Sequence, residues 1–141
     1  MNMLEQTQNS MCGFSLVRAA EAMLRTLGGA EVRLLFPKAT APDDPGAQLG
    51  LVAPEVEEVT LGPAAVRNVP KGAGDGHTRL EFLLPASEVI RRIEERQAAS
   101  AKVFFEAALG ILHQGRLLRI ESTEADFFAG MAYLYRVVAV E

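Results

Sequence analysis

The C-terminal stretch from Ala132 to Val140 most constrains the fold, because an extended chain there is apolar on both faces. One face carries Tyr133, Tyr135 and Val137, and the other carries Leu134, Val138 and Val140. A strand that is apolar on both faces is buried on both sides. The rest of the chain must therefore supply elements that cover this strand from two directions.

Two further segments before this strand predict a β-meander. Ile111–His113 and Arg116–Ile120 flank Gln114-Gly115, which is a plausible tight turn. We expect residues 121–130 to be a connection that leads into the final strand.

The N-terminal part predicts a helix over residues 11–27 that ends at Gly28-Gly29. Its apolar residues recur at spacings of three and four, as on one helix face: Phe14, Val17, Ala20, Leu24 and Leu27. Residues 1–10 are polar and carry neither a basic cluster nor an apolar core, so we expect a flexible segment rather than an export signal.

The middle of the chain alternates between strand patterns and breaks. The predicted strands are 30–36, 56–61, 64–69 and 79–84, with Gly62-Pro63 marking an edge or a bulge. Two helices are predicted next, one capped by Ser87 with Val89, Ile90 and Ile93 inward, and one capped by Ser100 with Val103, Phe104, Ala107 and Ala108 inward. A proline-rich loop over 37–54 and a glycine-rich turn over 70–77 interrupt these elements.

Because strands and helices do not alternate regularly, the pattern favours an α+β fold. We expect a mostly antiparallel sheet or small barrel of about five to seven strands, with about three helices and a C-terminal β-meander. A length of 141 residues fits one domain, which we place at residues 11–141.

Composition excludes several function classes. The net charge of −4 disfavours wrapping of nucleic acid by bulk charge. The single cysteine, Cys12, excludes an internal disulfide or a cysteine-rich zinc site, and no apolar run is long enough to span a bilayer. A mean hydropathy of +0.12 is high for a small monomer and favours oligomerisation, although a well-filled core rich in alanine explains it equally well.

No pattern of residues predicts catalysis, a metal site or a cofactor. The two histidines, His77 and His113, stand in predicted loops without metal-ligand spacing, and Cys12 has no histidine nearby. The glycine-rich turn precedes a strand and lacks a Gly-Lys-Ser/Thr signature, so we interpret it as a hairpin turn rather than a phosphate loop.

The most unusual feature is a pair of adjacent phenylalanines, Phe127-Phe128, in a predicted connection. Both cannot easily turn inward, so one is a candidate interface anchor, or else both plug the end of a sheet. The two long loops are further candidates for partner contacts. The predicted interface residues are Phe127, Phe128, Pro42, Asp43, Asp44, Pro45, Gly72, Gly74, Asp75 and His77.

The C-terminal stretches 111–120 and 133–140 together resemble the hairpins that close small neck proteins of tailed bacteriophages, namely head-completion adaptors, stoppers and tail terminators. The resemblance covers about thirty residues. It implies a structural subunit of the virion, assembled in the bacterial host cytoplasm as a ring of six or twelve copies. Its partners would be portal or tail subunits, with DNA passing through the channel, no membrane contact and no catalytic residues.

Two other classes stay open on the sequence. One is a small homodimeric ligand-binding or regulatory domain, which requires a concave pocket with a few converging polar groups. The other is an enzyme with a site assembled from scattered residues. An exposed apolar patch shared between subunits would favour the structural subunit.

Overall fold

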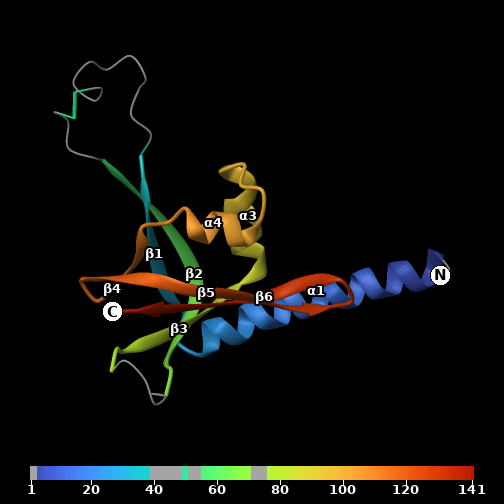
Figure 1. The fold of residues 1–141 in the computed structure, drawn as a ribbon. Helices are drawn as coiled ribbons and strands as arrows, with labels where there is room; N and C mark the ends of the chain where they lie inside the picture. Colours follow the sequence, from blue (N-terminus) through green and yellow to red (C-terminus); the bar gives the residue numbers. More distant parts are fainter. Residues whose placement is uncertain (1–2, 39–48, 51–54, 71–75) are drawn as a thin grey trace.

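The residues that the structure describes form a six-stranded antiparallel barrel with three helices, so the predicted α+β small barrel is confirmed (Figure 1). The computed structural model describes residues 3–38, 49–50, 55–70 and 76–141. The elements are α1 (Met3–Thr26), β1 (Ala30–Pro37), β2 (Val56–Asn68), β3 (Arg79–Pro85), α3 (Ala86–Glu95), α4 (Ala101–Glu106), β4 (Gly110–His113), β5 (Arg116–Phe128) and β6 (Met131–Val140).

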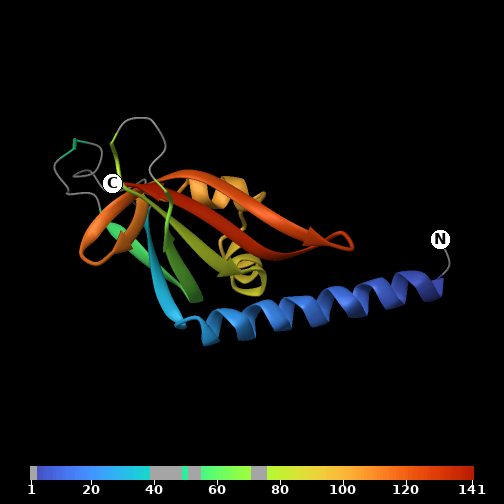
Figure 2. The ribbon, with the colours of Figure 1, turned by 90° about the horizontal axis from the view of Figure 1, so that it is seen from below.

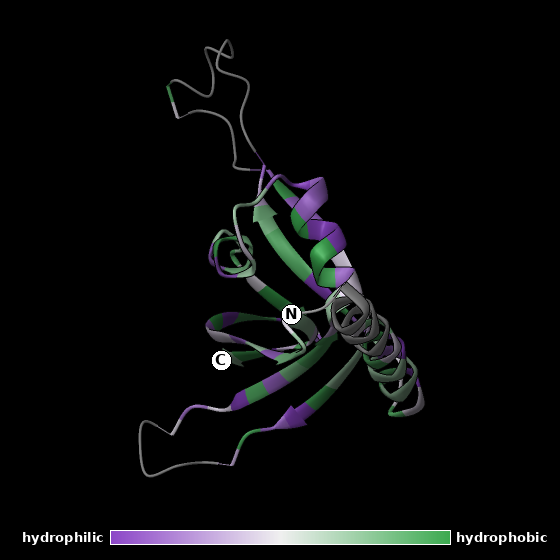
Figure 3. Cartoon of the chain, turned by 90° about the vertical axis from the view of Figure 1, so that its right-hand side faces the viewer, coloured by the Kyte–Doolittle hydropathy of each residue, from purple (hydrophilic) through white to green (hydrophobic). Residues whose placement is uncertain are grey.

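The barrel closes in the order β1-β2-β3-β6-β5-β4, with β4 pairing back onto β1. Hydrophobic and hydrophilic residues alternate along the strands, as period-two burial requires (Figure 3). The fully buried core side chains include Leu34, Phe36, Leu61, Phe82, Leu84, Ile111 and Val137. As predicted, β6 is buried on both faces, with Val137 in the core and Leu134 buried on the opposite face.

One corner of the barrel lies at Gly62-Pro63. The sequence predicted two short strands separated there, but β2 is continuous from Val56 to Asn68, so that prediction is wrong. The expected bulge is present, because Ala30 pairs with Ala64 and Val32 with Leu61. The missing ladder bond of Pro63 is tolerated at such an irregularity. Beyond it, β2 leaves β1 and pairs with β3.

The other correction concerns β5. Residues 121–130 were expected to connect two strands, yet β5 continues to Phe128 and pairs with β6 over that length. The polar residues of this stretch gave no apolar alternation, because most of this strand lies outside the core. Ala129-Gly130 alone forms the turn, with positive φ at both residues.

Helices α3 and α4 contribute the side chains Ala86, Val89, Phe104 and Phe105 to the core. Nη2 of Arg92 on α3 donates to the backbone carbonyl of Thr60 on β2 at 3.0 Å, which satisfies a carbonyl of that strand. These two helices therefore cover the core on the side of the barrel where β2 passes from β1 to β3 and β5 passes from β4 to β6.

The predicted helix faces and caps are only partly right. Ser100 caps α4 as expected, accepting from the Val103 backbone N–H at 3.2 Å. The cap of α3 is Pro85 instead of Ser87, because β3 runs directly into the helix. Ile90 is exposed, and α4 buries Phe104 and Phe105 rather than Val103 and Ala107.

Helix α1 begins at Met3 rather than at residue 11, since no glycine or proline interrupts residues 3–10. It contacts β6, β2 and β3 and extends past the barrel (Figure 2). Ala20 and Leu24 are buried as predicted, whereas Phe14 and Leu27 are exposed, so those two assignments are wrong. The buried face of the helix instead includes Gly13, which lies against Met131.

Candidate interaction surface

The β5–β6 hairpin ends in an exposed pair of aromatic side chains. Phe127 pairs with Ala132 and Phe128 with Met131, and the turn Ala129-Gly130 follows. Adjacent residues of a strand point to opposite faces, so one ring lies on each side of the hairpin. Phe127 is 65% exposed and Phe128 is 50% exposed. We call the segment 124–131 the hairpin tip.

The middle of α1, around Gly13, lies beside the hairpin tip, and the N-terminal end of the helix extends past it (Figure 2). A Cβ added at Gly13 would lie 3.2 Å from Sδ of Met131, so the helix and the tip are in close contact. The next residue, Phe14, is 62% exposed. The same end of the molecule therefore presents three exposed phenylalanines, which is the kind of apolar surface that marks protein contacts.

The charges of the hairpin tip centre on Arg136 of β6. Its Nη2 lies 3.0 Å from Oδ1 of Asp126 and 3.1 Å from Oε2 of Glu124. The charge of Asp126 and its hydrogen bond raise the pKa of Arg136, so the guanidinium stays charged. Two carboxylates share one cation here, which leaves the tip with one excess negative charge.

Packing of β6 anchors the hairpin to the core. Tyr135 pairs with Ala125 and is buried in the core, and burial raises the pKa of its phenol. The hairpin tip is thus attached to the core through β6.

Of the predicted interface residues, the described ones do not gather in one place. Phe127 and Phe128 lie at the hairpin tip, and both are exposed rather than one. His77 is exposed and precedes β3, whose first residue Arg79 pairs with Val140. Val140 and Met131 are the two ends of β6, so roughly 30 Å of strand separates His77 from the tip. Pro42, Asp43, Asp44, Pro45, Gly72, Gly74 and Asp75 lie outside the described residues.

Sequence reasoning missed Phe14 as a member of this surface. The spacing of three and four placed it on the buried face, but the helix passes the tip at Gly13 and turns Phe14 outward. A glycine inside a helical pattern was the available signal, because such a glycine often marks a close packing contact.

A hollow lies at the end of the barrel opposite to α3 and α4, next to the β4–β5 turn. We call it the barrel mouth. It has two lobes of about 360 and 490 Å³ that share Asn68, Leu80, His113 and Gln114. The ring of His113 meets Phe82 edge-on, with the ring centroids 5.5 Å apart. Amide and imidazole groups thus stand beside the apolar side chain of Leu80 at this barrel mouth.

In the described part of the chain, no three His, Cys, Asp or Glu side chains are grouped so that they could hold a metal ion. None of the described helices is long and apolar enough to cross a membrane.

Comparison with known proteins yields no relative. The chain matches no protein-family model, no curated protein and no solved structure.

Proposed function

We propose that this protein is a structural subunit of a tailed phage or a phage-derived particle, located at the head-to-tail junction. It acts through ring assembly and protein–protein contacts rather than through turnover. The single observation that carries the proposal is the hairpin tip, which exposes Phe127 and Phe128 on opposite faces of a projecting arm.

Two further observations support it. Phe14 on α1 extends the apolar surface beside the tip. The net charge of −4 suits a channel wall along which DNA must slide without binding. The likeness of residues 111–120 and 133–140 to neck-protein hairpins adds the location, because it covers β4, the start of β5 and most of β6.

Native mass spectrometry of the purified chain over a concentration series tests the proposal. A discrete species of six or twelve copies is expected. A species that stays a dimer at all concentrations would favour the alternative below. A chain that stays monomeric both alone and when mixed with isolated phage portal or tail rings would contradict the proposal.

The double substitution Phe127→Ser with Phe128→Ser should weaken assembly. Burial of each phenylalanine contributes about 1.5–3 kcal/mol, so loss of both should raise the dissociation constant at least about 100-fold. Because both side chains are exposed in the monomer, thermal unfolding should change little.

The matched control replaces two exposed apolar side chains elsewhere, Val56→Ser with Val103→Ser. The control should assemble like the native chain. Equal assembly by the native chain, the control and the tip variant would show that the phenylalanines are not the contact.

The second candidate is a small homodimeric ligand-binding or regulatory domain, and the barrel mouth is the observation that favours it. Mouths of β-barrels are common ligand sites, and this one places Asn68, His113 and Gln114 around the apolar side chain of Leu80. Screening a small-molecule library by NMR would show shifts confined to these residues. Absence of such shifts would remove this candidate.

A further inference from the structure

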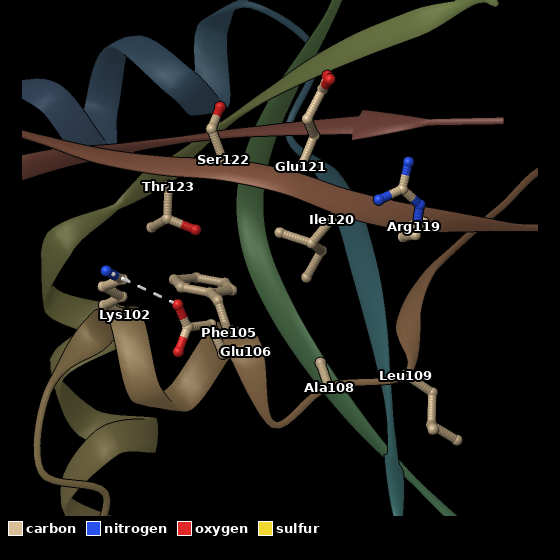
Figure 4. A pocket seen from close by; sticks show the side chains of 10 residues that line it. All are labelled: Lys102, Phe105, Glu106, Ala108, Leu109, Arg119, Ile120, Glu121, Ser122 and Thr123. Atoms are coloured by element: carbon tan, nitrogen blue, oxygen red, sulfur yellow. Dashed lines mark ion pairs between the residues drawn. The ribbon is translucent and has the colours of Figure 1, made fainter.

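A groove separates α4 from β5 on the side of the barrel away from α1 (Figure 4). Its volume is about 470 Å³, which lies in the range of binding pockets. Ile120 and Thr123 point from β5 toward α4, where Phe105 and Ala108 form the rest of the floor. The groove therefore offers an apolar floor large enough for an aromatic side chain.

One wall of this groove is an unpaired strand edge. β5 pairs with β4 only from Arg116 to Leu118, and from Arg119 onward the described chain pairs with it only through β6. The other edge of residues 119–128 has no neighbouring strand among the described ones. Unpaired backbone N–H and C=O groups of such an edge readily bind another chain.

One cation at the rim of the groove has no ion-pair partner within the described part of the chain. Lys102 lies 3.9 Å from Glu106, and Glu121 lies 2.7 Å from Arg79, which is not part of the groove. Arg119 is exposed at the rim and makes no ion pair with a described residue. The hairpin tip offers a complementary charge, because among the described residues Glu124 and Asp126 both pair with the one cation Arg136.

We propose that this groove binds the hairpin tip of a second copy of the chain. Phe128 of the second copy, which shares a face of β5 with Glu124, inserts against Phe105 and Ile120, and Arg119 pairs with the second copy's carboxylate at Glu124. The open edge of β5 bonds to the backbone of the incoming tip. This inference rests on the proposed function and names the contact through which the subunits assemble.

The contact suits a ring, because the tip and the groove are different patches of one chain. When each copy offers its tip to the next, the contacts are heterologous and repeat until the ring closes. A reciprocal exchange of tips between two copies would instead form a dimer. Stoichiometry therefore tests the ring, and a cross-link tests the contact.

The test uses two single-cysteine variants in a Cys12→Ser background. One carries Phe127→Cys at the tip, which keeps Phe128, and the other carries Leu109→Cys at the edge of the groove. They are mixed and treated with a short bismaleimide. The control replaces the tip variant by Val56→Cys, an exposed position at the start of β2.

The tip and groove variants should cross-link at least about tenfold more than the control pair. Adding Arg119→Glu to the groove variant should reduce the yield, and adding Glu124→Lys to the tip variant should restore part of it. If the tip and groove variants give the same cross-link yield as the control pair at every concentration tested, the inference is overturned.

The two hypotheses fail in different ways. A ring seen by native mass spectrometry without the cross-link would overturn the contact and leave the proposed function standing. The cross-link in a species that never exceeds a dimer would confirm the contact and contradict the ring.

Discussion

At the scale of single residues, the molecule uses buried glycines for close approach between elements. Gly110 begins β4, and a Cβ there would collide with the backbone carbonyl of Leu118 and lie 3.0 Å from Cδ1 of Leu117. Gly13 on α1 is equally buried, but its nearest neighbour is the flexible end of Met131. A backbone carbonyl cannot move aside within a strand ladder, whereas a methionine side chain can.

Gly110→Ala should therefore lower the free energy of unfolding by about 1–3 kcal/mol, the usual cost of overpacking. Gly13→Ala is the matched control, because Met131 can shift and alanine gains up to about 1 kcal/mol over glycine inside a helix. Urea unfolding of both variants measures the difference. Equal losses in the two would mean that the tight contact at Gly110 is absent.

At the scale of elements, the beginnings of α3 and α4 show two ways to start a helix. Ser100 supplies a side-chain cap to the Val103 backbone N–H. Pro85 is the N-cap residue of α3 and gives no side-chain hydrogen bond, because the chain arrives from β3 already extended. Ser87, which the sequence suggested as a cap, reaches across to Oε2 of Glu21 on α1 at 3.4 Å instead.

Ser100→Ala should cost about 1 kcal/mol of stability, as loss of a helix cap does. Ser87→Ala should stay within about 0.5 kcal/mol, because its long hydrogen bond is exposed. Thermal unfolding of the two variants shows which substitution costs more stability. A larger loss for Ser87→Ala would reverse the assignment of the cap.

At the scale of the whole molecule, the barrel and its two covering helices form one core. Phe104 on α4 is fully buried, and its ring centroid lies 5.2 Å from that of Phe36 on β1 and 5.0 Å from that of Phe105. Arg96, which follows α3, places its guanidinium 4.0 Å from the centroid of the Phe36 ring. α4 is thus tied to a strand that lies far from it in the sequence.

Phe104→Ala should remove about 3–5 kcal/mol of stability by leaving a cavity. Because α4 shares the core with the strands, unfolding should remain a single transition with coincident fluorescence and circular dichroism curves. Val103→Ala, which truncates the exposed neighbour, is the control. Two separate transitions in Phe104→Ala would show that the helices form a unit of their own.

The sequence by itself determined the antiparallel α+β fold and the order of most elements, and it left open whether Phe127-Phe128 is exposed or plugs the end of a sheet. These features follow from local patterns: period-two alternation in β1 and β3, a glycine turn at Gln114-Gly115 and apolar residues on both faces of β6.

Only the tertiary structure decided the length of β5, the exposure of Phe14 and the open edge beside α4. The polar residues of β5 carry no burial pattern, since their strand is held by backbone bonds to β6. The groove depends on where β4 ends relative to β5, and the face of α1 depends on its contact with Met131. Such properties come from pairing between distant segments, which no local periodicity records.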